Sequence, residues 1–98
     1  MQRAVRPTAL FCAQDRIAAN VYRALQDMNL SIPDDVAILG FDNHVDVATT
    51  LSPKLSTMAL PHYEMGQWAV EYLVNGATHS PKPIQAKLPC VYVERESA

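Results

Sequence analysis

Two kinds of apolar pattern alternate along this chain, and the switches between them mark the expected elements. Residues 36–41 form a continuous apolar run with one glycine, rich in β-branched and aromatic side chains, which predicts a strand covered on both faces. A shorter apolar run occupies residues 8–13. Between these runs, residues 15–28 place apolar side chains at helical spacing, namely Ile17, Ala18, Val21, Ala24, Leu25 and Met28. Strand, helix and strand within about 35 residues predict a right-handed βαβ unit with parallel strands.

The sequence also predicts where this first helix ends. Asn29 suits the left-handed position that follows a helix, and Leu30 supplies the hydrophobic contact that accompanies such an ending. Pro33 and the acidic pair 34–35 then form the turn into the strand.

The second half of the chain predicts a short helical turn at residues 45–48, a strand at 55–60 and a longer helix. Pro61 ends the strand and is acceptable at the first position of the helix. The helix is expected to end at 75–76, where a glycine follows an asparagine. Its core stripe comprises Met65, Trp68, Ala69, Tyr72 and Leu73.

This second helix is apolar around more of its circumference than one sheet requires, since Val70 and Val74 lie on another face. A further part of the protein is therefore expected to cover it. A polar loop at 78–83 precedes a final strand at 87–93, in which Pro89 is typical of a sheet edge. The charged residues 94–96 are expected to end the structured part.

Composition and charge exclude several function classes. The 98 residues fit one small domain, and 49% of them are hydrophobic, which argues against disorder. The net charge is −2 and no run of Lys or Arg occurs, so the basic surface of a nucleic-acid-binding domain is missing. No apolar stretch approaches the roughly 20 residues that span a bilayer. The first residues are charged without an apolar region, so no signal peptide is expected.

The two cysteines, Cys12 and Cys90, fall inside predicted strands and not in a disulfide-scaffold spacing. Small buried thiols of this kind need no function. The prediction is that both are reduced and structural, in a cytoplasmic protein.

Polar side chains follow the first two predicted strands at their carboxyl ends. Gln14 and Asp15 follow the first strand, and Asp42 and Asn43 follow the second. Ligands of open α/β sheets bind at this edge, and a carboxylate there, with acceptors only, suits a hydroxyl-rich ligand. Two structural alternatives remain open: Asp15 as the cap of the first helix, and Asp42 as the side chain that closes a turn.

No pattern of an enzyme or a metal site is found. The three glycines are too far apart for a phosphate-binding loop, and a G-x-S-x-G element is absent. His44, His62 and His79 are not at metal-ligand spacing. The sequence predicts no catalytic residue, no metal ion and no cofactor.

The edge of the first helix presents Ala19, Tyr22 and Gln26 on adjacent turns. Tyr is favoured at interfaces, so this edge is a candidate subunit contact. The alternative is a tyrosine that lies on the surface with a solvated hydroxyl.

In combination, these motifs resemble the LacI/GalR family of bacterial sugar-responsive transcriptional repressors, collinearly from Pro7 to the end. Each motif alone is weak, whereas six in order at near-family spacing are specific. They are the turn 11–15, the Ala-Leu pair 24–25, the turn and strand 30–36, the strand end 40–43, the segment 53–57 and the segment 64–66.

The resemblance implies an α/β fold, a parallel three-layer sandwich. This chain would be a β-α-β-β-α-β fragment of a periplasmic-binding-protein-like fold. It implies that residues 1–98 are the C-terminal part of an effector-binding and dimerisation domain. Residues 1–59 and 85–95 would belong to the C-terminal subdomain, and 60–84 would be a helix segment of the N-terminal subdomain. The DNA-binding helix-turn-helix domain would be absent from this chain.

By resemblance, the effector-binding residues are Asp42, Gln14, Leu60 and His62. Gln14 stands where many members have Asn, and Leu60 where many have Gln. His62 lies where some members have a ligand-facing aromatic residue. The dimer interface implied by the family includes the helix edge around Ala19, Tyr22 and Gln26, together with Leu51.

The leading hypothesis is therefore the effector-binding part of a dimeric, allosteric repressor. Its effector would be a carbohydrate or a related polar metabolite, and it would contact operator DNA only through the missing domain. Two alternatives share parts of the pattern: a sugar-binding protein of a transport system, and a receiver-like signalling domain with Asp42 as acceptor. The second fits poorly, because such domains usually place further acids at the end of the first strand.

Overall fold

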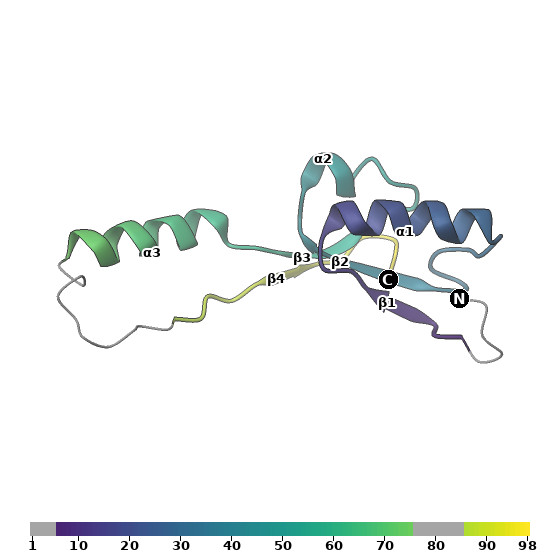
Figure 1. Cartoon of the computed structure of the whole chain (residues 1–98), viewed down its shortest axis with the longest axis horizontal. Helices are drawn as coiled ribbons and strands as arrows, with labels where there is room; N and C mark the ends of the chain where they lie inside the picture. Colours follow the sequence, from purple (N-terminus) through teal and green to yellow (C-terminus); the bar gives the residue numbers. More distant parts are fainter. Residues whose placement is uncertain (1–5, 76–85) are drawn as a thin grey trace.

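A four-stranded mixed sheet forms the centre of the computed structural model, which describes residues 6–75 and 86–98 (Figure 1). The strands lie side by side in chain order: β1 (Ala9–Phe11), β2 (Ala37–Asp42), β3 (Ser56–Ala59) and β4 (Val91–Val93). β1, β2 and β3 are parallel, as predicted, whereas β4 is antiparallel to β3. The α/β class and the periplasmic-binding-protein-like arrangement are confirmed, with this one antiparallel edge.

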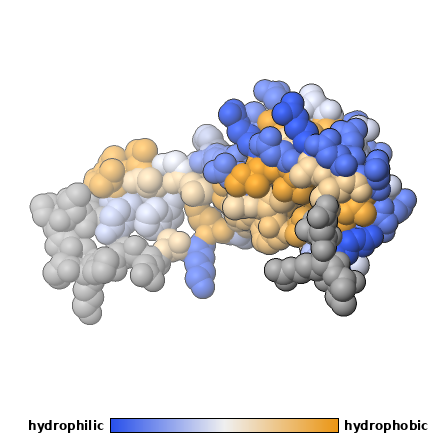
Figure 2. All heavy atoms as spheres, turned by 45° about the vertical axis from the view of Figure 1, so that its right-hand side comes forward, coloured by the Kyte–Doolittle hydropathy of each residue, from blue (hydrophilic) through white to orange (hydrophobic). Residues whose placement is uncertain are grey.

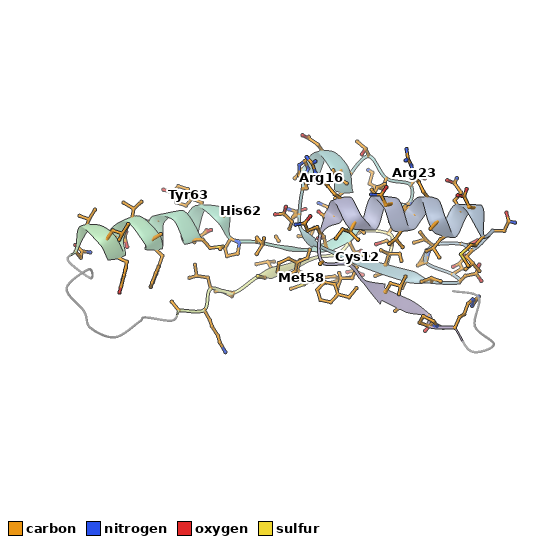
Figure 3. All side chains as sticks on the ribbon, in the orientation of Figure 1. Cys12, Arg16, Arg23, Met58, His62 and Tyr63 are labelled. Carbon is orange, nitrogen blue, oxygen red and sulfur yellow. The ribbon has the colours of Figure 1, made fainter. Side chains whose placement is uncertain are left out.

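Helices α1 (Asp15–Asp27) and α2 (Val45–Ala48) lie over one face of the sheet (Figure 1). The predicted helix ending is confirmed: Asn29 has φ 57°, and the Leu30 N–H donates to the Leu25 carbonyl at 2.9 Å. Arg16 and Arg23 lie on the outer side of α1, away from the sheet (Figure 3). The core between helices and sheet comprises Cys12, Ala18, Tyr22, Leu25, Val36, Ile38, Ala48 and Leu55.

The other face of the sheet is only partly covered. Along β2, Ile38 and Gly40 are buried, but the residues that alternate with them, Ala37, Leu39 and Phe41, are half-exposed. On that second face Phe11 is 66% exposed, and its ring lies 6.2 Å from that of Phe41. In Figure 2, apolar side chains are visible at the surface of this part of the molecule, lower in the view than a polar upper region. Within residues 6–75 and 86–98, helices cover only one face of the sheet, so the expectation of a strand covered on both faces is wrong.

Helix α3 (His62–Val74) projects away from the sheet (Figure 1). None of its residues is buried, and its apolar side chains are exposed, for example Leu73 at 60% and Val74 at 76%. The rings of Trp68 and Tyr72 stack on each other, with centroids 5.2 Å apart. The predicted core stripe is therefore wrong within this chain, because no element of the described part packs against it.

The end of the chain is more ordered than its charged sequence suggests. Beyond β4, Ser97 is fully buried between β2 and β3, where its carbonyl accepts from the Ile38 N–H at 2.8 Å. Its Oγ accepts from the Ser56 N–H at 2.8 Å. The expectation that residues 94–96 end the structured part is therefore wrong. Pro89 lies before β4, which forms one edge of the sheet.

Tyr22 is also a core residue. It is 8% exposed, and its hydroxyl donates to the Pro53 carbonyl at 2.8 Å. Burial raises the pKa of this hydroxyl. The interpretation as a surface tyrosine with a solvated hydroxyl is therefore wrong: the ring fills the gap between α1 and the loop before β3.

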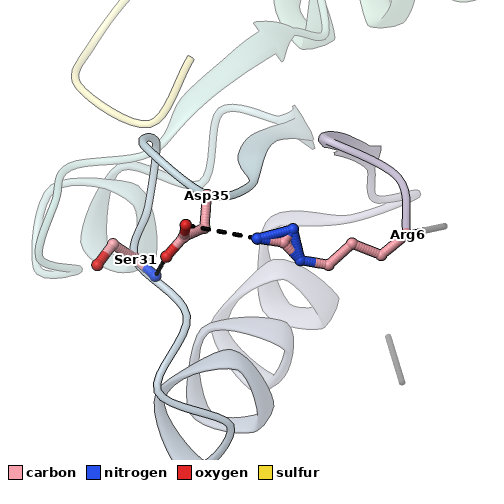
Figure 4. A network of polar contacts seen from close by, with 3 residues as sticks. All are labelled: Arg6, Ser31 and Asp35. Carbon is pink, nitrogen blue, oxygen red and sulfur yellow. Dashed lines mark hydrogen bonds and ion pairs between the residues drawn. The ribbon is translucent and has the colours of Figure 1, made fainter. Parts of the chain in front are cut away.

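At the amino ends of the parallel strands, a polar network fixes the turn into β2 (Figure 4). Asp35 accepts from the Ser31 N–H at 2.7 Å and pairs with Arg6 at 3.4 Å. In the described ranges no helix combines the length and apolarity needed to cross a bilayer. The expectations for residues 78–83, for Gly76 and His79 and for the first residues of the chain lie outside the described residues.

Candidate functional site

The candidate site is a backbone corner at the carboxyl end of β2, formed by Asp42, Asn43 and His44. Asp42 has φ 124° and Asn43 has φ 60°. Two consecutive residues other than glycine with positive φ are uncommon, and such conformations persist only where surrounding contacts hold them. This corner is where the side chains that follow β2 leave the sheet, and contacts from three other segments hold it.

Asp42 contacts the crossing from β3 to α3. Its Oδ1 lies 2.9 Å from His62 Nε2, and its carbonyl accepts from the Leu60 N–H at 3.4 Å. The carboxylate side chain is 34% exposed and the imidazole is 66% exposed, so a ligand can reach both. Figure 3 shows His62 where the chain leaves the sheet. The structure thus brings together three of the four predicted effector residues.

Gln14, the fourth, lies at the carboxyl end of β1 as the N-cap residue of α1, exposed and in extended conformation. β1 and β2 are parallel neighbours, so Gln14 and Asp42 leave the sheet at the same edge. Within residues 6–75 and 86–98 no hydrogen bond joins these two side chains. Their shared cleft stays a prediction.

Asp15 is neither a ligand candidate nor a cap of its own helix. It is 1% exposed, and both carboxylate oxygens accept hydrogen bonds within the chain. Oδ2 accepts from the His44 N–H at 2.6 Å, and Oδ1 accepts from the Thr57 hydroxyl at 2.7 Å. Asp15 as the cap of α1 is therefore wrong, since the N-cap residue is Gln14, and Asp15 as a ligand residue is wrong because its side chain turns inward and connects the start of α2 to β3.

Gly40 makes room for this inward carboxylate. A Cβ at residue 40 would collide with Asp15 Oδ1 and lie 2.8 Å from a methyl group of Leu55. Only glycine allows β2 to approach the Asp15 side chain so closely.

Arg95, in the tail after β4, also holds the corner. Its Nη2 donates to Asn43 Oδ1 at 2.8 Å, and its Nη1 donates to the Leu55 carbonyl at 2.8 Å. Its backbone N–H donates to Ser56 Oγ at 2.8 Å. The sequence alone does not indicate this role of Arg95, because 52 positions separate Arg95 from Asn43 and no local pattern reports such a contact.

The four residues predicted for the dimer interface line one surface depression between α1 and the loop after α2, together with Asn20, Arg23, Thr50 and Ser52. Ala19 and Leu51 are half-buried and Gln26 is exposed, while Tyr22 forms part of the floor. The chain itself thus places them on a common surface, and their contact with a second subunit stays a prediction.

Cys12 follows the last residue of β1 and lies in the core, two residues before Gln14. Both cysteines of the chain are free, and Cys12 is 6% exposed. Burial, with a smaller contribution from the Asp15 carboxylate, raises the pKa of the Cys12 thiol.

We therefore expect iodoacetamide at neutral pH to alkylate the partly exposed Cys90 and to spare Cys12. The thiolate is the reactive species, so a raised pKa delays labelling of Cys12 to higher pH. Peptide mass spectrometry would measure both sites, with Cys90→Ser as the variant that takes up almost no label. Equal labelling of both thiols in the folded protein would contradict the burial of Cys12.

Comparison with known proteins decides the family. The model of the periplasmic binding protein-like domain matches residues 1–98. The lactose operon repressor of Rhizobium radiobacter is 42% identical over 97 residues, which cover 96% of this chain and 82% of that protein. The chain belongs to the LacI family of transcriptional regulators.

Other LacI-family proteins extend the comparison. The ribose operon repressor of Haemophilus influenzae is 48% identical over 69 residues, which are 70% of this chain. The chain spans only 20% of that repressor's length. These relatives are transcriptional repressors and not enzymes.

Two solved structures of LacI-family regulators share the fold, each 35% identical over 92% of this chain and 34% of theirs. The regulator from Enterococcus faecium, with bound ribose, gives a TM-score of 0.71. The regulator from Arthrobacter, in complex with lactose, gives a TM-score of 0.74.

Proposed function

We propose that this chain is the C-terminal part of the effector-binding and dimerisation domain of a LacI-family transcriptional regulator whose effector is a carbohydrate. The observation that carries the proposal is the partly exposed Asp42 carboxylate beside His62, at the strand edge where α/β proteins bind ligands. Family members with ribose and with lactose bound support a sugar as the effector. The kinship with repressors favours this function over a transport protein.

The chemistry of the corner suits a sugar. Asp42 Oδ1 is already engaged by His62, and Oδ2 offers acceptor capacity to a hydroxyl group. Leu60 adds an apolar contact for the ring face, and the exposed Gln14 amide can donate and accept at the same edge. We assign the effector-binding role to these four residues.

We further propose that residues 1–59 and 85–95 belong to the C-terminal subdomain, and 60–84 to the N-terminal one. The exposed apolar surface of α3 supports this division, because a helix with no buried residue needs a covering partner. The Asp42–His62 contact then lies at the crossing between subdomains, and an effector that binds there favours one closure angle over another.

In this proposal the regulator acts as a cytoplasmic homodimer. The depression lined by Ala19, Tyr22, Gln26 and Leu51 contributes to the contact between subunits. Operator DNA is bound through a helix-turn-helix domain outside this chain.

The test is calorimetric titration of the whole regulator with D-ribose and with lactose. We expect Asp42→Asn to weaken the sugar that binds by about 10- to 100-fold, which corresponds to a lost hydrogen bond to a charged group. Asn tolerates a positive φ better than most residues, so the corner should keep its shape.

Asp46→Asn is the matched control, because it removes the same charge from an exposed position four residues away, in α2. It should leave sugar affinity unchanged. Equal affinity of Asp42→Asn and the unmodified regulator would refute the assigned site.

A further inference from the structure

The tail after β4 reaches the proposed effector site, although it lies far from that site in the sequence. The guanidinium of Arg95 bonds to the Leu55 carbonyl, immediately before β3, and to Asn43 Oδ1, immediately after β2. The tail itself is held by the buried Ser97 and by the bond from the Arg95 N–H to Ser56 Oγ. The backbone and the guanidinium of Arg95 are therefore both held by hydrogen bonds to other segments.

The backbone conformation of Asn43 requires contacts of this kind. With Asp42 it forms a corner of two residues at positive φ, a conformation that costs free energy unless contacts hold it. On the other side of the corner, the Asp15 carboxylate holds the His44 N–H. The Asn43 side chain is thus held by the hydrogen bond from Arg95. The preceding residue, Asp42, carries the carboxylate that would contact the ligand.

We propose that Arg95 is a positioning residue for effector binding: by holding the Asn43 side chain, it orients the Asp42 carboxylate toward the ligand. This inference rests on the proposed function for the role of Asp42. It assigns to the C-terminal tail an influence on effector affinity.

The planar guanidinium is suited to this role because its fork donates to two acceptors at once. A lysine is a single point donor on a flexible stem, so Arg95→Lys keeps the charge but cannot reproduce both bonds. Asn43→Gly removes the acceptor while keeping a residue that adopts positive φ without cost.

The first experiment is a double-mutant cycle on the whole regulator, titrated with D-ribose. We expect Arg95→Lys and Asn43→Gly each to raise the Kd by about tenfold, and the double variant to raise it no further, since both remove one contact. Additive effects would show that Arg95 acts by another route and would overturn the proposal.

The matched control is Arg6→Gln. Arg6 also pairs with a partner far along the chain, Asp35, but at the amino ends of the strands, away from the site. It should leave the Kd unchanged. If it weakens binding as much as Arg95→Lys, general destabilisation explains both effects and the proposal fails.

A second measurement needs no ligand. Hydrogen exchange of a peptide that covers residues 42–48 should be faster in Arg95→Lys than in the unmodified regulator, while a peptide from the middle of α1 stays unchanged. Unchanged exchange at the corner would refute the positioning role even if D-ribose is not the effector. Failure of the proposed function is recognised separately, by full sugar affinity in Asp42→Asn.

Discussion

Replacement of Asp15 by alanine is expected to lower the free energy of unfolding by about 4 kcal/mol. The Thr57 hydroxyl and the His44 N–H would each lose a bond to a carboxylate, and an unsatisfied buried donor costs roughly 1–3 kcal/mol. The empty space left behind adds to this cost. Urea unfolding of the variant and of the unmodified chain, followed by circular dichroism, would measure the difference.

Asp34→Ala is the control, since Asp34 is an exposed carboxylate in the turn before β2. It should change the free energy of unfolding by less than about 0.5 kcal/mol. A similarly small effect of Asp15→Ala would mean that the buried carboxylate does not connect α2 to the sheet.

Gly40→Ala should be destabilising by about 3 kcal/mol, at the upper end of the cost of overpacking a core. The added methyl group would collide with Asp15 Oδ1 and press on Leu55 Cδ2 at 2.8 Å and on Thr57 Oγ1 at 3.2 Å. Gly66→Ala, in the exposed helix α3, is the matched control, because a Cβ there meets nothing within 4 Å. Ala favours a helix over Gly, so the control should stabilise the chain by about 0.5–1 kcal/mol.

The two substitutions should also be coupled. In the Asp15→Ala background the nearest obstacle to a methyl group at residue 40 is gone, so Gly40→Ala should cost clearly less there than in the unmodified chain. Independent, additive costs would show that the carboxylate is not what excludes a side chain at residue 40.

Local patterns were sufficient for most elements of this fold. The helical spacing and the Asn29–Leu30 ending predicted α1 because both act between residues close in sequence. The apolar run before Asp42 predicted β2, and the parallel βαβ arrangement followed from handedness. The position of Asp42 at the strand end followed from the same reasoning, since the end of an apolar run fixes where a polar residue leaves the sheet.

The roles of Asp15 and Arg95 could not be predicted because they depend on partners 29 to 52 positions away. A polar residue after a strand has the same local pattern whether it faces a ligand or turns into the core. Gly40 was the available indication for Asp15: a glycine inside an apolar strand often marks a close approach of another group. For α3, the helical spacing predicted the helix but not the exposure of its apolar stripe, because spacing does not report whether a second element covers it; within residues 6–75 and 86–98 none of the residues of α3 is buried.

The tail also constrains how sequences of this family can drift in length. Val93 is paired with Thr57 in the sheet, Arg95 reaches across to Asn43, and Ser97 lies between β2 and β3. One residue inserted or deleted between Val93 and Ser97 would move Arg95 or Ser97 away from its hydrogen-bond partners, because β4 fixes where this tail begins. Insertions and deletions between β4 and Ser97 should therefore be selected against. We expect aligned relatives to show no gap in this segment.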